Sequence, residues 1–375
     1  MMTLHTSESE VLSSVRGNGK WARGLGVMTS PSRGEGREFE SPRAHDLFIL
    51  SAYSFMEEFT YAKAGVDIDK EDRVVKGILE TVGFEEDKIE INGIKLVLCT
   101  DGVGSKVIVA NEMKKWDTVG IDCVAMNVND ALVVGARPLA FVDYLAIEKT
   151  DEERAKEIAK GLRRGAEEAG IPIIGGETAT LPEIIRGFDL AGTCLGLIEK
   201  EIPKELNEGD AIIGIRSNGL HSNGYTLARK IFVNRGYSFH DEIDDIGVIG
   251  YELLKPTKIY VKEILHLWKS IEVKGIAHIT GGGLRKIKRI SKRVCFCIEE
   301  PIEPQPIFKV IQKLGNVSEK EMYQTFNMGM GMAIIIAREY VDDALDMLNK
   351  YVEAKVVGKI KKGYGVEVPK LGLKY

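Results

Sequence analysis

The spacing of apolar positions changes in a regular order along the chain from residue 94 onward. Short, nearly continuous apolar runs predict strands, and longer segments in which apolar residues return about every three to four positions predict helices. In the first half, this pattern predicts strands at 94–100, 139–148, 171–176 and 189–199 and helices at 117–136 and 151–170. This order predicts an α/β sandwich with its helices on one face of the sheet.

A second α/β half follows the polar segment 200–207, which predicts a boundary. Beyond it, the pattern predicts strands at 211–217, 273–279, 294–298, 331–337 and near Val356, and helices from Tyr225, at 256–268, from Leu284, at 307–314 and at 339–351. We therefore expect two domains of the α/β class (α+β type), at 56–200 and 208–370, with a cleft between them.

Residues 1–55 do not share this pattern. They are rich in Ser, Gly and Arg, and patterned sequence begins only at Met56. No apolar stretch following a basic start fits a secretory signal. Two interpretations remain: a disordered extension, or upstream non-coding sequence translated from a start codon placed too early. We favour the second and expect translation to begin at Met56.

Composition excludes several classes of protein. The formal net charge is −5 with both signs of charge mixed, so nucleic acid is not an expected partner. No apolar run reaches the roughly 18 residues of a membrane span. The five cysteines lie scattered in apolar segments, which predicts reduced thiols and a cytoplasmic location. The six histidines show no metal-ligand spacing, so a structural zinc site is not expected.

The first strand ends in "TDGVGSK", a turn with an aspartate before it. It is not a Walker P-loop, because that loop needs longer glycine spacing and a lysine before the hydroxyl residue. Taken alone, Gly102 and Gly104 fit a simple tight turn as well as they fit a phosphate-binding one. If the turn is functional, its amides and Lys106 would face phosphates, and Asp101 would be a metal ligand.

The helix at 118–134 carries three polar residues on one face. Asp122 and Asn129 are seven positions apart, nearly two helical turns, and Asp130 lies beside them. One interpretation is solvent exposure or pairing with a nearby Lys or Arg. The other is that Asp101 and Asp130 jointly hold a hard cation, Mg²⁺ or K⁺.

A third carboxylate follows a glycine pair in "IIGGETA", where Gly176 precedes Glu177. This can be a mere turn. Three carboxylates, each at the edge of an apolar element, favour a shared acidic site.

Two polar loops of the second half contain histidines. "LHSNGYT" carries His221 before Ser222 and Asn223, either of which can cap the following helix and leave amides free for an anion. "AHITGGG" carries His278 before Thr280 and a run of three glycines. Each loop is weak support alone, but together they face the expected cation site and describe an ATP-using active site between the two halves.

At this point the chain resembles one family, the phosphoribosylformylglycinamidine cyclo-ligases, also called aminoimidazole ribonucleotide synthetases. The resemblance runs in order from about Tyr61 to Val368. It rests on the motifs "AGVDI", "TDGVGSK", "DTVGIDCVAMNVND", "GGETA", "HSNGY", "KPTKIYVK", "AHITGGG" and "MYQTFNMGMGM". Of these, "HSNGY" together with "MYQTFN" is the most specific, whereas the aspartate–glycine loop is shared across a wider superfamily.

The resemblance implies a homodimer in which the N-terminal domains form a β-barrel, and a C-terminal α/β domain that closes over the cleft. It implies ATP-dependent ring closure of formylglycinamidine ribonucleotide to aminoimidazole ribonucleotide, with release of ADP and phosphate, in purine biosynthesis. ATP is needed because a formyl oxygen is a poor leaving group until it is phosphorylated.

The resemblance also implies roles for individual residues. Those expected to be catalytic are His221, His278 and Asp130, and those expected to bind the metal are Asp101 and Asp130. Those expected to bind the nucleotide are Asp101, Gly102, Gly104, Lys106, Asn129, Gly176 and Glu177. Those expected to bind the substrate are Ser222, Asn223, Thr280, Gly281, Gly282 and Asn327.

Two features depart from the family pattern. The segment 82–95 lacks the glycine-rich loop that many members carry there, and "YAKAGVD" places Lys63 one position later than usual. The contacts that these residues make with the nucleotide are therefore left open.

Other functions remain as alternatives. Selenophosphate synthetase would need a reactive cysteine near the N-terminal loop, and no cysteine precedes Cys99. The hydrogenase maturation enzyme would end in a reactive cysteine, whereas this chain ends in "KLGLKY". A nucleotide-binding regulator without activity would not require so many acidic and histidine groups. ATP-dependent formation of aminoimidazole ribonucleotide would distinguish these possibilities.

Overall fold

The computed structural model describes residues 58–83, 87–203 and 205–375 of the 375-residue chain. All of them belong to one compact unit. The predicted start at Met56 and the interpretation of residues 1–55 lie outside the described residues. Below, the N-terminal half means residues 58–198 and the C-terminal half means residues 211–375.

The N-terminal half is built on a five-stranded sheet in the order β1-β2-β5-β3-β4. Its strands are β1 (Ile89–Ile91), β2 (Ile94–Gly102), β3 (Ala136–Ile147), β4 (Ile173–Thr180) and β5 (Phe188–Ile198). All neighbours are antiparallel except β3 and β4. The parallel pair requires a crossover, which is supplied by the helix α5 (Glu152–Ala169).

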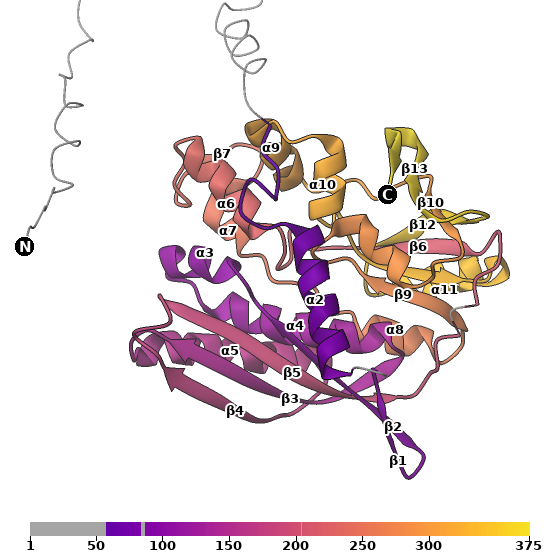
Figure 1. Cartoon of the computed structure of the whole chain (residues 1–375), viewed down its shortest axis with the longest axis horizontal. Helices are drawn as coiled ribbons and strands as arrows, with labels where there is room; N and C mark the ends of the chain where they lie inside the picture. Colours follow the sequence, from indigo (N-terminus) through magenta and orange to yellow (C-terminus); the bar gives the residue numbers. More distant parts are fainter. Residues whose placement is uncertain (1–57, 84–86, 204) are drawn as a thin grey trace, which may run out of the picture. The chain divides into compact units, whose positions relative to one another are not determined.

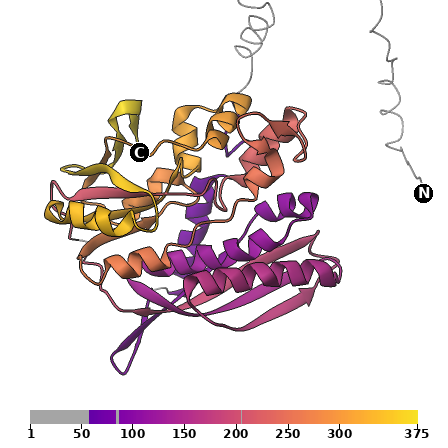
Figure 2. The ribbon, with the colours of Figure 1, turned by 180° about the vertical axis from the view of Figure 1, so that it is seen from behind.

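Both long helices of this half lie on the same face of the sheet, as the pattern predicted (Figures 1 and 2). α4 (Asp117–Val133) is almost wholly buried between the sheet, α5 and the C-terminal half. A side chain at Gly120 would place its Cβ only 2.3 Å from the backbone of Leu162, so glycine permits the close approach of α4 and α5. α5 is capped by the Asp151 side chain at its start and by Gly170 at its end.

This half has two further helices. The helix α3 (Lys106–Met113), which the sequence pattern did not predict, follows the "GVGS" turn directly. The helix α2 (Ile68–Val82) begins at Asp67, whose side chain accepts a hydrogen bond from the Lys70 amide. Arg285 of the C-terminal half donates to Asp69 at 2.8 Å, so α2 is attached to both halves.

The C-terminal half is built on a seven-stranded sheet in the order β14-β13-β10-β12-β6-β11-β9. Its strands are β6 (Ala211–Arg216), β9 (Val273–His278), β10 (Cys295–Ile298), β11 (Met330–Ile336), β12 (Ala354–Lys361), β13 (Gly365–Val368) and β14 (Leu373–Lys374). Its helices are α6 (Tyr225–Asn234), α7 (Ile249–Leu253), α8 (Val261–Leu267), the 3₁₀ helix η1 (Gly283–Arg289), α9 (Pro306–Gly315), α10 (Glu319–Thr325), η2 (Arg338–Tyr340), α11 (Val341–Leu348) and η3 (Pro369–Leu371). The short hairpin β7 (Glu242–Ile243) and β8 (Gly247–Val248) stands apart.

The α/β fold class is confirmed, and two predicted helices are corrected. The helix expected from Pro256 begins only at Val261. The amides of Thr257 and Tyr260 donate to side chains of α4, and residues 256–260 therefore form an irregular connection rather than a helical turn. The helix expected from Leu284 is a short 3₁₀ helix. The domain limits proposed from the sequence stay a prediction.

Neither large sheet of the described chain is closed on itself, so a β-barrel is not formed within one chain. Within the described ranges, no helix is both long and apolar enough to cross a membrane.

The five cysteines are free thiols, and burial raises the pKa of Cys99 and of Cys194 to about 12. These two thiols are therefore protonated and unreactive at neutral pH.

Candidate active site

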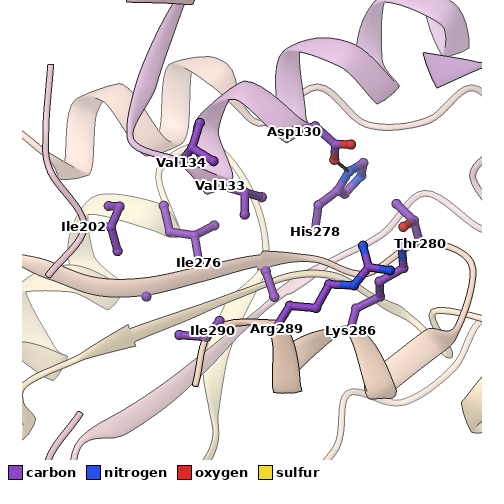
Figure 3. Close-up of a pocket in the computed structure, with 12 residues that line it drawn as sticks. Asp130, Val133, Val134, Ile202, Ile276, His278, Thr280, Lys286, Arg289 and Ile290 are labelled. Carbon is purple, nitrogen blue, oxygen red and sulfur yellow. Dashed lines mark hydrogen bonds and ion pairs between the residues drawn. The ribbon is translucent and has the colours of Figure 1, made fainter. Parts of the chain in front are cut away.

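Two neighbouring hollows lie where the halves meet. The main cavity has a volume of about 460 Å³ and is lined by α2, the "DGVGS" turn, the loop before α6 and the turn after β9. The side pocket has a volume of about 190 Å³ and shares Thr280, Lys286 and Arg289 with the main cavity. Figure 3 shows the side pocket with a polar end at Asp130 and His278 and an apolar end at Val133, Val134 and Ile276.

Asp101 and Asp130 approach each other across this region. Asp101 ends β2 and lines the main cavity, and Asp130 lies near the end of α4 and lines the side pocket. Burial raises the pKa of Asp101 above its ordinary value, and repulsion from the Asp130 carboxylate raises it further. Two carboxylates that repel each other form a site that favours a cation.

The Asp130 carboxylate is held by His278. The imidazole Nδ1 lies 2.8 Å from Asp130 Oδ1, and its Nε2 lies 3.4 Å from the amide nitrogen of Asn129. Because the Asn129 amide nitrogen can only donate, Nε2 accepts, and the hydrogen on Nδ1 donates to the carboxylate. The Asp130 side chain is 44% exposed, whereas that of His278 is 1% exposed, so the histidine orients a carboxylate that faces the pocket.

The described residues contain no cluster of three or more His, Cys, Asp or Glu side chains that could hold a metal by themselves. Mg²⁺ is usually held by one or two carboxylates, with waters and substrate phosphates completing its shell. Asp101 and Asp130 therefore fit a Mg²⁺ ion that arrives with a nucleotide, and they do not fit a metal held by the protein alone.

Lys106 lies away from the cavities, in a buried ion pair. Its ammonium contacts both carboxylate oxygens of Asp122, at 3.0 and 2.8 Å, and donates to the carbonyls of His221 and Lys255 at 3.1 and 2.7 Å. Lys106 and Asp122 are both 0% exposed. All three donors of the lysine are thus used. In this arrangement the ammonium of Lys106 faces neither hollow, so its expected contact with phosphate stays a prediction.

Asn129 and Asp122 join α4 to the backbone of the C-terminal half. Asn129 donates to the carbonyl of Lys258 at 2.8 Å and accepts from the amide of Tyr260 at 3.0 Å. Asp122 accepts from both the amide and the hydroxyl of Thr257, each at 2.6 Å. The shared face predicted for these residues is present, but Asn129 has no polar group left for a nucleotide.

His221 lies in the interior, 1% exposed, with a left-handed backbone at φ 62°. Its Nε2 accepts from the amide of Asn218 at 3.1 Å and lies 3.5 Å from that of Lys258. Burial lowers the pKa of His221 well below its ordinary value, and the positive charge of Lys106 contributes. The imidazole is therefore neutral and holds the loop together, so the expected direct contact with substrate is not supported.

The "HSNGY" loop brings two of its predicted residues to the main cavity. Ser222 and Asn223 both line it. Neither caps α6 as expected, because the N-cap position is occupied by Gly224, which has no side chain to bond the first amides of the helix. The Asn223 amide nitrogen is buried and has no hydrogen-bond partner within the described chain. An uncapped helix start beside an unpaired amide donor fits an anionic or carbonyl-bearing ligand.

The turn after β9 lines the hollows through Thr280 and Gly281, and Gly282 lines a small pocket beside them. A Cβ at Gly281 would lie 2.9 Å from Asn223 Oδ1, so a side chain there would displace the Asn223 amide group. Asn327, by contrast, accepts from Ser217 Oγ and the Gly329 amide and donates to the Gly219 carbonyl. Asn327 shapes the loops and does not line these hollows, which corrects its expected role.

Glu177 is separated from the acidic pair by the geometry of the sheet. Asp101 faces Gly192 on β5, Gly192 faces Asp143 on β3, and Asp143 faces Gly176 on β4. A Cβ at Gly192 would lie 3.1 Å from Cys123 of α4, so this row of residues points toward the helices. Glu177, one position after Gly176, points to the opposite, uncovered face. The expected joint site of Asp101, Asp130 and Glu177 is not formed within one chain.

Comparison with known proteins places this arrangement in a family. Models described as the N-terminal and C-terminal domains of AIR synthase related protein match residues 85–198 and 207–369. A phosphoribosylformylglycinamidine cyclo-ligase from Methanosarcina acetivorans is 50% identical over 334 residues, which cover 84% of this chain and 98% of the relative. One from Methanocaldococcus jannaschii is 48% identical over 321 residues, covering 80% and 92%.

The chain belongs to the phosphoribosylformylglycinamidine cyclo-ligase family. The resemblance drawn from its motifs is confirmed.

Among solved structures, a thiamine monophosphate kinase from Aquifex aeolicus has a TM-score of 0.58 at 16% identity, and the match covers 82% of this chain and 98% of the kinase chain. The hydrogenase maturation protein HypE has a TM-score of 0.54 at 18% identity, covering 77% and 91%. At such identities, these likenesses show the fold alone.

Two basic residues of this cyclo-ligase family member were not predicted as site residues. Lys286 and Arg289 follow the glycine run and line both the main cavity and the side pocket. Burial lowers the pKa of Lys286, and the nearby charge of Arg289 lowers it further. Their signal in the sequence was the basic run "LRKIKR" directly after "TGGG".

Proposed function

We propose that the chain is the ATP-dependent ligase that closes the imidazole ring of aminoimidazole ribonucleotide in purine biosynthesis, and that the reaction takes place in the cavities between its two halves. The observation that carries the proposal is the 50% identity to a cyclo-ligase over 98% of that relative's length. The paired carboxylates, the unpaired amide of Asn223 and the basic wall of the cavity support it.

ATP would enter with its phosphates toward Asp101 and Asp130. A Mg²⁺ ion bound by these carboxylates would neutralise charge on the phosphates during transfer. His278 would keep Asp130 aimed at the ion through the 2.8 Å hydrogen bond. The amide of Gly104 would lie beside the phosphates, since Gly104 lines the main cavity, whereas the amide of Gly102 donates to Asp101 Oδ1 at 2.7 Å and holds that carboxylate in place. A requirement for K⁺ stays a prediction.

The substrate would occupy the side of the cavity formed by the C-terminal half. Ser222, Asn223 and Thr280 would orient the ribonucleotide so that its formyl oxygen faces the terminal phosphate of ATP. Phosphorylation of that oxygen gives an imino phosphate. A nitrogen of the amidine then attacks the same carbon, the new C–N bond forms, and the C–O bond breaks with release of phosphate. The proton set free at this step would leave with the phosphate, because both ring nitrogens of His278 already take part in hydrogen bonds with Asp130 and Asn129.

A homodimer is part of the proposal. Leu98 and Tyr144 are 68% and 43% exposed, and both point to the face of the first sheet that the helices leave uncovered. Exposed apolar side chains on an open sheet face favour burial against a second copy. Glu177 lies on that same face and would then be near the partner rather than near Asp101 of its own chain.

The proposal is tested by incubating the purified full chain with formylglycinamidine ribonucleotide, ATP and Mg²⁺ and measuring aminoimidazole ribonucleotide. Asp130→Asn should reduce Mg²⁺-dependent turnover by at least about 100-fold while the melting temperature stays nearly unchanged, because the carboxylate is half exposed and Asn still accepts from His278. Absence of product from the wild-type chain would refute the function. Normal turnover in folded Asp130→Asn would refute only the metal assignment.

A further inference from the structure

We propose that Lys286 and Arg289 form a phosphate-binding subsite at the junction of the main cavity and the side pocket. The inference rests on the proposed function and adds to it two residues that neither the motifs nor the expected roles include. The ligand class is a phosphate group, carried either by the ribonucleotide substrate or by ATP.

The position of the two side chains is the first support. Both come from η1 and line both hollows. Figure 3 shows them on the wall opposite Asp130 and His278, with their cationic ends close to Thr280. A ligand in the side pocket therefore lies between an acidic wall and a basic wall.

The balance of charge is the second support. Other cations of this region are already paired: Arg285 with Asp69 at 2.8 Å, Lys106 with Asp122 and Lys258 with Glu263 at 2.9 Å. Lys286 forms no ion pair or hydrogen bond with any residue of the described ranges, and the ion pair of Arg289 there is with Asp72 at 3.8 Å. Asp101, Asp130 and Asp72 lie near Lys286 without contacting its ammonium. The donors of both residues are thus available to an anion.

The surrounding polar groups suit a phosphate in particular. The Asn223 amide nitrogen is buried, unpaired and on the wall of the same cavity. The Thr280 hydroxyl lines both hollows beside Lys286. Two cations and two neutral donors match a phosphate group, which offers several strong acceptor oxygens and up to two negative charges.

The test compares Lys286→Met and Arg289→Gln with the wild-type full chain. Binding of ribose 5-phosphate and of ADP is measured by titration calorimetry, and KM is measured for formylglycinamidine ribonucleotide and for ATP. We expect each substitution to weaken binding of one probe by about 10- to 100-fold, as for the loss of a charge-assisted hydrogen bond. The matched control is Lys262→Met, which removes an exposed lysine on α8 that lines neither hollow.

The pattern of loss identifies the source of the phosphate. A rise in KM for the ribonucleotide, with weaker ribose 5-phosphate binding, assigns the subsite to the substrate. A rise in KM for ATP, with weaker ADP binding, assigns it to the nucleotide. Lys286→Arg keeps the charge and should retain binding within about fivefold.

The inference is overturned if both substitutions leave both dissociation constants within about twofold of the wild-type values, or if the wild-type chain binds neither probe. If Lys286→Met fails to fold, Arg289→Gln and Lys286→Arg still decide the question. Failure of the wild-type chain to form product would reject the proposed function, whereas calorimetry would still report on the subsite.

Discussion

Replacing Lys106 by methionine should strongly destabilise the folded chain. Methionine keeps most of the volume but removes an ammonium that contacts both oxygens of Asp122 and two backbone carbonyls of the C-terminal half. Asp122 would then be a fully buried carboxylate with only Thr257 as its partner. Breaking a buried ion pair in this way costs about 3 to 5 kcal/mol. For a chain of this size, the loss corresponds to a drop in melting temperature on the order of 10 °C.

The assay is thermal and denaturant unfolding of Lys106→Met, of Asp122→Asn and of the double variant. In the double variant, the amide that replaces the Asp122 carboxylate has no charge to neutralise and still offers an oxygen to the Thr257 amide, so more than half of the lost stability should return. The control is Lys160→Met, which removes an exposed ion pair with Glu157 and should leave the melting temperature nearly unchanged.

Two results would refute this reasoning. A loss below about 1 kcal/mol in Lys106→Met would mean that Asp122 does not depend on the ammonium. A large rise in KM for ATP with an unchanged melting temperature would restore the phosphate-binding role that the sequence suggested for Lys106.

Two further predictions concern pH and assembly. The pKa of His221 is lowered in the folded state, so the unfolded state binds more protons and stability should fall as pH drops below about 6.5. His221→Gln should make the melting temperature less dependent on pH between about 7.5 and 5.5. The control, His240→Gln at an exposed position, should not change this dependence. Equal slopes of melting temperature against pH for the wild type and His221→Gln would contradict the prediction. Leu98→Asp should convert the proposed dimer to a monomer, as measured by light scattering. Val233→Asp, at an exposed position of the C-terminal half, should leave the dimer intact. A monomeric wild-type chain would contradict the proposed dimer.

Much of the fold and part of the site could be predicted from local patterns. The strands and helices of the first half lie close to their predicted positions, because apolar spacing and helix caps act within a single element. The approach of Asp101 to Asp130 was also predictable, since one lies at a strand exit and the other on the face of the following long helix. Both kinds of prediction concern a single element or elements that lie close together in the sequence.

The remaining site roles depended on relations between distant parts of the chain. The seven-residue spacing of Asp122 and Asn129 predicted a shared face, but not that this face would be covered by the backbone of residues 255–260. Glu177 was misplaced because its orientation depends on the register across four strands, which the sequence of one strand does not contain. His221 was assigned a catalytic role because of its residue type, whereas its burial depends on how two loops pack.

The contacts of α4 with the C-terminal half differ in kind on their two sides. Asp122 and Asn129 of α4, with Lys106 at the start of α3, use their side chains, whereas Lys255, Lys258 and Tyr260 meet them through backbone carbonyls and amides. From the C-terminal half, Thr257 adds its hydroxyl and His278 its imidazole. A replacement at 255 or 258 keeps the backbone contact with Lys106 or Asn129 and acts instead through the ion pairs with Glu252 and Glu263. A replacement at 106, 122 or 129 removes the contact itself, so the side chains at these three positions are the ones that the junction requires.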